Sequence, residues 1–179
     1  MRIRPNSVDG RGRAGIVVSA FVCAALFGGC ATARPAGPKA DAAPVQFSAR
    51  TLGGTQVWSL ADQKGHPVLL SSWATWCGPC REELPELQKL SDQEQTHGLH
   101  VLGVDVDDGS DAAPLQYIRQ HDLSFPMVHD TDNSFQATFL SLGVPYSVLI
   151  DSNGRVVHKW PGALDVEAAL PEIKKAENG

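Results

Sequence analysis

The chain has 179 residues, of which 15 are Lys or Arg and 20 are Asp or Glu, so its formal net charge is -5. An apolar content of 42% fits one soluble domain with a modest extra segment, and it excludes collagen-like and wholly disordered chains. Because the charge is negative, the sequence offers no global basic surface for a nucleic-acid backbone, which argues against DNA or RNA as a partner.

The first thirty residues have the pattern of an export signal. Four arginines precede a mostly apolar run over residues 16–29, whose 14 residues are fewer than the about 18 that a transmembrane helix needs. We therefore predict a signal peptide over residues 1–29. The sequence Leu-Phe-Gly-Gly-Cys, which ends at Cys30, resembles a bacterial lipobox, so we expect Cys30 to become a lipidated N-terminus.

A second cleavage site competes with this lipobox. Ala31-Thr32-Ala33 forms an Ala-x-Ala site, and cleavage after Ala33 would release a soluble periplasmic protein. Removal of residues 1–29 leaves 11 basic and 19 acidic residues and a net charge of -8. Attachment of the mature chain to an anionic membrane would therefore depend on the lipid and not on electrostatic attraction.

The mature chain divides into a linker and one domain. Residues 30–44 contain three prolines and no large apolar side chain, so they cannot bury a core and are predicted to be a disordered linker. The folded domain is expected over residues 45–177, a length that suits a single hydrophobic core. Apolar patterns of strand and helix type alternate along it, which favours an α/β fold.

Predicted strands and helices follow one another along this domain. The strands are an N-terminal hairpin around Phe47 and Val57 with a turn at Gly53-Gly54, followed by residues 67–73, 101–106, 125–128, 146–150 and 156–160. The first predicted helix begins at the cysteine motif described below, has Leu84, Leu87 and Leu90 on its apolar face, and ends before Gly98. The other helices pass through Leu115 and Ile118, cover residues 135–142, and begin at Asp165. Ser110 or Asp111 can cap the second helix, and Pro171 predicts a kink or break in the last.

The sequence Trp-Ala-Thr-Trp-Cys-Gly-Pro-Cys comes directly after the first buried strand. Its cysteines, Cys77 and Cys80, are three residues apart at a strand-to-helix junction. Cys77 is therefore expected at the helix N-terminus, where free N–H groups and the helix dipole stabilise a thiolate. Cys80, one turn further, can resolve a mixed disulfide between Cys77 and another protein. Pro79 suits the first helical turn, because its missing N–H would have no partner there.

Other uses of this cysteine pair fit the sequence less well. Zinc needs about four ligands, and the mature chain has no second cysteine pair; we expect its six histidines to be solvated or locally hydrogen-bonded. Haem attachment requires a histidine where Arg81 stands. The peroxidatic motif Pro-x-x-x-Thr-x-x-Cys does not match residues 71–77, so a peroxiredoxin-like peroxidase is kept as an alternative only. A protein that delivers Cu(I) between the two thiolates without turnover is another alternative.

Acidic residues cluster at the end of the predicted strand over residues 101–106 and just after it. They are Asp105, Asp107, Asp108 and Asp111. An EF-hand does not fit, because Gly109 comes one position early and Gln116 stands at the place of the final glutamate. We therefore expect a solvated loop here.

The cysteine motif, the Cys-Arg-Glu-Glu-Leu-Pro sequence that overlaps its end, and Gly-Val-Pro-Tyr-Ser-Val-Leu-Ile-Asp-Ser-Asn-Gly-Arg-Val-Val further on resemble the thioredoxin superfamily. The wider layout resembles its exported TlpA/ResA-type thiol-disulfide reductases over nearly all of residues 45–175. This resemblance implies a thioredoxin-like fold, with a central mixed sheet flanked by helices, an N-terminal β-hairpin and an inserted strand–helix element. It also implies reduction of protein disulfides without a cofactor or a metal.

The same resemblance implies a substrate-binding surface. Pro145 corresponds to the cis-proline that packs beside the cysteine pair, and the backbone of Val144 would pair with an extended substrate peptide. Trp76 would present a flat apolar surface to the partner protein. Gly78 and Pro79, between the two cysteines, complete the predicted substrate-binding set.

The proton acceptor differs from that of thioredoxin. Thioredoxins carry a buried aspartate six residues before the first cysteine, where this chain has Ser71, which cannot act as a base near neutral pH. Glu83 lies three residues after Cys80, on nearly the same helix face, and it matches the glutamate of ResA-type proteins. We expect burial against Trp73 or Trp76 to raise its pKa into a range useful for acid–base catalysis.

The Gly-Pro dipeptide between the cysteines favours reduction as the direction of electron flow. It matches the thioredoxin motif, whose potential is about -270 mV, against about -120 mV for the oxidant DsbA. A reductase in an oxidising compartment needs a source of electrons, and the resemblance implies a membrane thiol transporter of the CcdA or DsbD type. The expected substrates are disulfide-bearing envelope proteins, apocytochrome c among them.

Overall fold

The computed structural model describes residues 43–94 and 97–178. The predicted signal peptide, the predicted lipidation site at Cys30 and all of the predicted linker up to residue 42 lie outside the described residues. Among the helices that are described, none has the length and apolar character needed to cross a membrane.

Seven strands in the described part of the chain form one mixed sheet, with the spatial order β2-β1-β5-β4-β3-β6-β7. They are β1 (Ser48–Thr51), β2 (Val57–Ser59), β3 (Val68–Trp73), β4 (His100–Asp105), β5 (Met127–His129), β6 (Tyr146–Ile150) and β7 (Val156–Pro161). β3, β4 and β5 are parallel, and every other neighbouring pair is antiparallel. The predicted strands are all present, and β1 joins the N-terminal hairpin to the sheet through β5.

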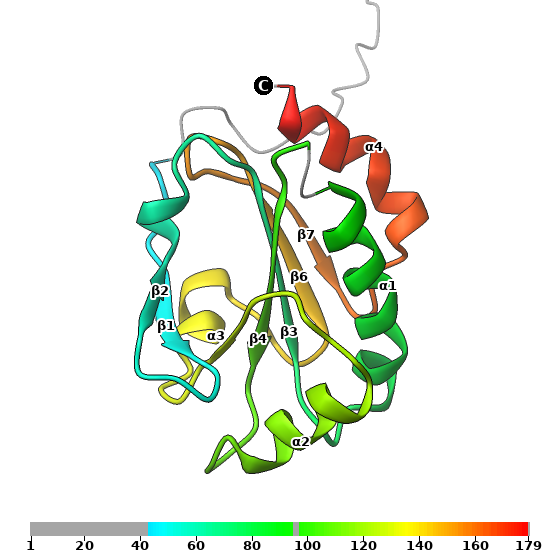
Figure 1. Cartoon of the computed structure of the whole chain (residues 1–179). Coiled ribbons are helices and arrows are strands. Elements are labelled where there is room, and N and C mark those ends of the chain that lie inside the picture. Colours follow the sequence, from blue (N-terminus) through cyan, green and yellow to red (C-terminus); the bar gives the residue numbers. More distant parts are fainter. Residues whose placement is uncertain (1–42, 95–96, 179) are drawn as a thin grey trace, which may run out of the picture. The chain divides into compact units, whose positions relative to one another are not determined.

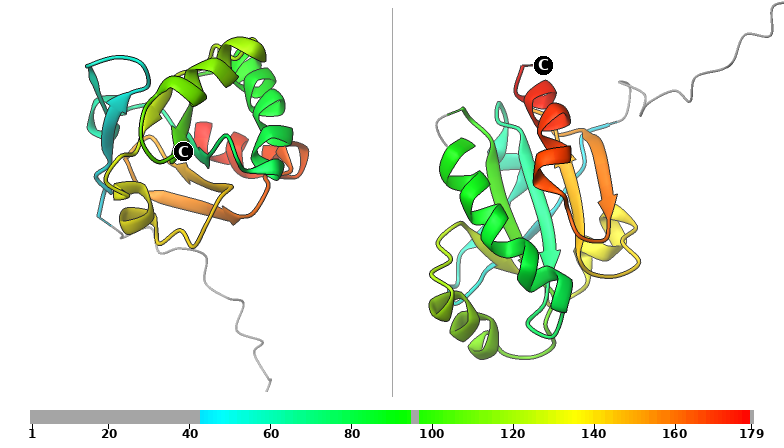
Figure 2. Two further views of the ribbon diagram at one scale, coloured as in Figure 1. Left: turned by 90° about the horizontal axis from the view of Figure 1, so that it is seen from below. Right: turned by 90° about the vertical axis from the view of Figure 1, so that its right-hand side faces the viewer.

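Four α-helices accompany the sheet within the described residues. They are α1 (Gly78–Glu94), α2 (Ala112–Gln120), α3 (Ser134–Phe139) and α4 (Val166–Glu177), and a 3-10 turn (Leu60–Gln63) follows β2. α1 and α4 lie side by side on one face of the sheet, and α3 lies on the opposite face (Figures 1 and 2). This arrangement confirms the predicted thioredoxin-like fold.

Alternation of side chains along β3 explains the two-sided core. All six residues of β3 are buried. Leu69 packs in the cluster that holds the apolar residues of α1 and α4, whereas Leu70 packs in the cluster that holds Phe135 and Phe139 of α3. Because helices cover both faces, this central strand can be apolar nearly throughout.

Three local expectations differ from the structure. The third helix ends at Phe139 and not near residue 142, because Leu140 adopts a left-handed conformation with φ of 57°. α4 continues through Pro171 without a break. Asp111 stands at the N-cap position of α2, but its side chain caps no backbone N–H of that helix and forms other contacts instead.

Candidate active site

Cys77 and Cys80 form a disulfide at the N-terminus of α1, with 5.3 Å between their Cα atoms. Cys77 is 5% exposed and Cys80 is 1% exposed, so Cys77 is the sulfur nearer to the surface. The N–H of Cys80 donates to Cys77 Sγ over 3.2 Å, and the N–H of Cys77 donates to the carbonyl of Ala74 over 3.1 Å. The helix N-terminus therefore offers a hydrogen bond to the sulfur that is predicted to attack, as thiolate stabilisation requires.

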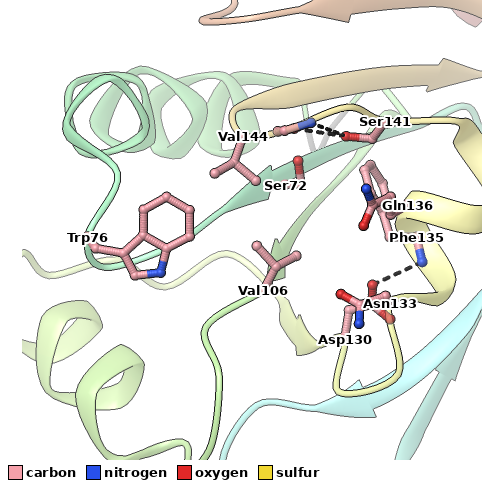
Figure 3. A pocket seen from close by; sticks show the side chains of 10 residues that line it. Ser72, Trp76, Val106, Asp130, Asn133, Phe135, Gln136, Ser141 and Val144 are labelled. Atoms are coloured by element: carbon pink, nitrogen blue, oxygen red, sulfur yellow. Dashed lines mark hydrogen bonds between the residues drawn. The ribbon is translucent and has the colours of Figure 1, made fainter.

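Residues from distant parts of the chain line a cavity of about 200 Å³ beside this helix N-terminus. Trp76, which is 68% exposed, and Val144 both contribute to its wall. Figure 3 shows Trp76 at one end of the cavity and Asp130 with Asn133 at the other. The remaining lining residues are Ser72, Val106, Phe135, Gln136, Ser141 and Gly143. The Val144-Pro145 bond is cis, as the resemblance implies, and Pro145 is buried.

Asp130, the acidic residue that lines this cavity, stabilises the start of α3. Asp130 follows β5, and its carboxylate accepts the N–H groups of Ser134 and Phe135, both over 3.0 Å. It therefore satisfies the first N–H groups of α3. Burial raises the pKa of Asp130, against the effect of these hydrogen bonds. The end of the cavity at Asp130 is thus polar and fixed by hydrogen bonds, while Trp76 and Val144 contribute apolar surface to its wall.

Glu83 is buried, with 4% of its surface exposed. Its Oε1 accepts the hydroxyl of Ser71 over 2.8 Å and the hydroxyl of Ser147 over 3.5 Å, and its Oε2 accepts the N–H of Leu164 over 2.9 Å. Burial raises the pKa of Glu83, and the three hydrogen bonds, which favour the charged form, reduce this increase. The predicted burial of Glu83 is confirmed, and its hydrogen-bond partners are Ser71, Ser147 and Leu164.

Ser147 and the backbone of Leu164 are parts of this site that the sequence analysis missed. Ser71 of β3 and Ser147 of β6 are directly paired across the sheet, so both hydroxyls reach the same face and the same carboxylate. The sequence contains one signal for this pairing. Each serine lies in a buried strand that is mostly apolar, and a buried hydroxyl needs a polar partner.

The expectation of a solvated acidic loop after β4 is wrong for three of its four aspartates. Asp105 is fully buried, and burial raises its pKa to about 7. Asp107 accepts hydrogen bonds from Thr75 in the cysteine motif, and Asp111 forms a salt bridge with Arg50 of β1. Only Asp108 is exposed as expected. No group of three or more His, Cys, Asp or Glu side chains in the described part of the chain is arranged to hold a metal ion.

His129, at the end of β5, differs from the predicted solvated or locally hydrogen-bonded histidine. Its side chain is 0% exposed. Its ring contacts Asp111, which lies 18 residues away along the chain, and the carbonyl of Asp107. The geometry thus connects the end of β5 with the loop that contacts the cysteine motif.

Comparisons with known proteins agree with this geometry. The sequence model of the AhpC/TSA family matches residues 40–159. The thiol-disulfide oxidoreductase ResA of Bacillus thuringiensis subsp. konkukian is 32% identical over 129 residues, which cover 72% of this chain and 73% of ResA. The thiol:disulfide interchange protein DsbE of Pseudomonas aeruginosa is 33% identical over 129 residues, which cover 72% of this chain and 66% of DsbE.

Solved structures show the same fold. A thiol:disulfide interchange protein of the thioredoxin family from Chlorobium tepidum aligns with a TM-score of 0.68 and 25% identity, over 78% of this chain and 99% of that protein. The family description alone does not separate disulfide exchange from peroxide reduction. The names of the relatives point to thiol-disulfide exchange, and the Cys77–Cys80 disulfide is the group that such exchange uses.

Proposed function

This chain belongs to the AhpC/TSA family and is a thiol-disulfide oxidoreductase, and we propose that it works as a reductase of protein disulfides in the bacterial cell envelope. The observation that carries the proposal is the buried Cys77–Cys80 disulfide at the N-terminus of α1, beside a cavity that Trp76 and Val144 line. The reduced form of this pair carries two electrons that it can pass to a substrate disulfide, and the neighbouring cavity offers a place for part of a substrate polypeptide.

The proposed cycle starts from the reduced pair. The thiolate of Cys77 attacks one sulfur of a substrate disulfide, forms a mixed disulfide and releases the other substrate sulfur as a thiolate. Cys80 then loses its proton, and its thiolate attacks Cys77 Sγ. This second step breaks the mixed disulfide, releases the second substrate thiol and leaves the Cys77–Cys80 disulfide that the structure contains. The substrate gains two electrons and the protein loses two.

Glu83 is the proposed proton acceptor for Cys80. It follows Cys80 by three residues on α1, which places the two side chains on neighbouring positions of one helix face. Its raised pKa brings proton uptake closer to neutral pH than that of an exposed glutamate. Ser71, Ser147 and Leu164 hold the carboxyl group at one place.

The proposed substrate surface consists of Trp76, Val144 and the residues between the two cysteines. Trp76 offers an exposed aromatic face, and Gly78 and Pro79 lie half-buried and exposed beside it. Pro145 packs next to this surface, and Val144 would pair its backbone with an extended substrate segment. The cavity of about 200 Å³ then receives a substrate side chain near the disulfide.

The direction of electron flow is tested by the reduction potential of the Cys77–Cys80 pair. We expect equilibration with dithiothreitol buffers to give a value closer to the about -270 mV of thioredoxin than to the about -120 mV of DsbA. The freshly reduced protein should also reduce insulin disulfides, with precipitation of the insulin B chain as the measurement. A potential near that of DsbA would reverse the direction, and a failure to reduce insulin would contradict the reductase assignment.

The proposed location rests on the leader sequence. We propose that residues 1–29 direct export, that Cys30 carries a lipid and that the proline-containing segment up to residue 44 tethers the domain to the membrane. In a bacterial expression host, the full chain should enter the detergent phase of a Triton X-114 extract, whereas Cys30→Ser should not. A wild-type protein that stays in the aqueous phase with Arg34 as its first residue would instead establish cleavage after Ala33.

The proposed partners follow from the same direction and location. A reductase in an oxidising compartment must be reduced again after each cycle, so we propose a membrane thiol transporter of the CcdA or DsbD type as the electron donor. The proposed substrates are disulfide-bearing envelope proteins, including apocytochrome c. The exposed face of Trp76 is expected to serve both the donor and the substrate, because both reactions pass through Cys77.

A further inference from the structure

Asp107 holds the turn that leads from β3 to the active-site helix. Its Oδ2 accepts the N–H of Thr75 over 2.8 Å, and its Oδ1 accepts the hydroxyl of Thr75 over 3.0 Å. Thr75 lies two residues before Cys77, and the carbonyl of Ala74 accepts the N–H of Cys77. The carboxylate of Asp107 therefore fixes both the N–H and the hydroxyl of Thr75, in the short turn that leads to Cys77.

The ring of His129 fixes Asp107 in turn. Its Nε2 lies 2.9 Å from the carbonyl oxygen of Asp107, and its Nδ1 lies 2.6 Å from Oδ1 of Asp111. A carbonyl oxygen can only accept a hydrogen bond, and so can an ionised carboxylate. Arg50 donates to both oxygens of Asp111, over 2.7 and 2.8 Å, and keeps that carboxylate ionised by lowering its pKa. Both ring nitrogens of His129 therefore lie against acceptors, and this favours the imidazolium form, although Nη2 of Arg50 also lies near Nδ1.

The titratable and charged groups around this buried ring come from four parts of the fold. Asp105, at the end of β4, places its Oδ2 3.8 Å from Nε2 of His129. Asp107 lies in the loop that follows β4, and Asp111 precedes α2. Arg50 belongs to β1, and its Nη2 lies 3.3 Å from Nδ1 of His129. His129 and Arg50 thus share Asp111 as a counter-ion. A charge without exposure to water is tolerable here because acceptors and counter-ions surround it.

We propose that Asp107 and His129 are positioning residues of this oxidoreductase: His129 fixes the loop after β4, and through this loop Asp107 sets the place of Cys77 at the helix N-terminus. The inference rests on the proposed function, because it assigns the two residues to the attacking cysteine. Its physical consequence is direct. When the turn is loosened, Cys77 Sγ loses part of the hydrogen bond from the N–H of Cys80, and the thiolate is less stabilised.

The test is the alkylation rate of the reduced full-length protein with iodoacetamide, measured against pH. For Asp107→Ala we expect a pKa of Cys77 higher by about one unit, and hence an alkylation about tenfold slower below that pKa, because the thiolate is the reacting form. Asp107→Asn should restore most of the rate. Its amide oxygen can accept the N–H of Thr75, and its amide nitrogen can donate to the threonine hydroxyl.

The direction in which the pKa of Cys77 changes separates a positioning role of Asp107 from an effect of its charge alone. If Asp107 acted only through its negative charge, both variants would lower the pKa of Cys77 and alkylation would become faster. That result, or an unchanged profile in Asp107→Ala, would overturn the proposal. Alkylation needs no disulfide substrate, so its outcome does not depend on whether the protein reduces insulin.

His129→Gln tests the other half of the proposal. An uncharged glutamine donates at one end only, so it cannot hold Asp107 and Asp111 together, and the alkylation rate should fall between those of the wild type and Asp107→Ala. His100→Gln is the matched control, because His100 begins β4 and lies at the end of that strand away from Asp105 and the loop that holds Asp107. This variant should keep the wild-type dependence of alkylation on pH. If His129→Gln does not fold, Asp111→Ala, which removes the acceptor of His129 Nδ1, is expected to slow alkylation in the same way. A wild-type rate in the folded variant, His129→Gln or Asp111→Ala, would overturn this half.

Discussion

Cys80→Ser is expected to stop turnover and to trap the substrate on Cys77. The first step of the proposed cycle needs only the thiolate of Cys77, whereas release of the substrate needs a second thiolate behind it. A hydroxyl cannot replace that thiolate near neutral pH. The variant should therefore accumulate a mixed disulfide with one substrate chain per protein, visible as a mass increase that dithiothreitol removes. Its multiple-turnover rate should fall by at least about 1,000-fold.

Cys77→Ser is the matched variant for this experiment. Cys80 lies in the first turn of α1 and is 1% exposed, so we expect that a substrate disulfide cannot reach its sulfur. We expect no turnover and no trapped substrate. If Cys77→Ser trapped the substrate as well as Cys80→Ser does, the roles of attacking and resolving cysteine would have to be exchanged.

The parts of the site that the sequence could predict depend on short separations along the chain. Cys77 directly precedes α1, Cys80 lies in its first turn and Glu83 follows on the same helix face, so helix geometry alone brings these groups together. The strand order was not needed for these predictions. The apolar run of β3 was also sufficient to place the motif at the end of a buried central strand.

The parts that could not be predicted depend on the order of strands in the sheet. His129 meets Arg50 only because β5 lies between β4 and β1, and 79 residues separate the two along the chain. An aspartate-rich loop with a glycine has the composition of a solvated loop, and nothing local shows that Asp105 and Asp111 face a buried histidine. Ser147 likewise reaches Glu83 through the register between β3 and β6, which alternation alone does not determine.

Glu83→Gln is expected to leave the fold intact and to slow the second step of the cycle. The glutamine amide oxygen can accept the N–H of Leu164, and its N–H₂ can donate to the hydroxyl oxygens of Ser71 and Ser147, which can turn to accept. Each of the three partners of the carboxylate can therefore keep one hydrogen bond to the amide. The variant cannot take up the proton of Cys80, so release of the mixed disulfide should slow by about 100-fold, while attack by Cys77 is unaffected.

The same variant has a pH-dependent effect on stability. Because burial raises the pKa of Glu83 in the folded protein above its ordinary value, the folded state binds this proton more tightly than the unfolded state does. The resulting stabilisation is fully present below the ordinary glutamate pKa and is lost as the pH rises through the folded-state pKa. Urea unfolding of wild type and Glu83→Gln between pH 4 and 8 should therefore show the wild type losing stability relative to the variant as the pH rises.

Glu82→Gln is the matched control that separates the role of Glu83 from a general effect of removing a negative charge. Glu82 is exposed on α1, one residue earlier, so Glu82→Gln changes the net charge equally without changing the buried site. In single-turnover experiments, wild type and Glu82→Gln should show the same rise in mixed-disulfide release as Glu83 ionises, and Glu83→Gln should lack it. A release profile in Glu83→Gln that matches the wild type would remove Glu83 from the mechanism, since a proton acceptor cannot be replaced by an amide without loss.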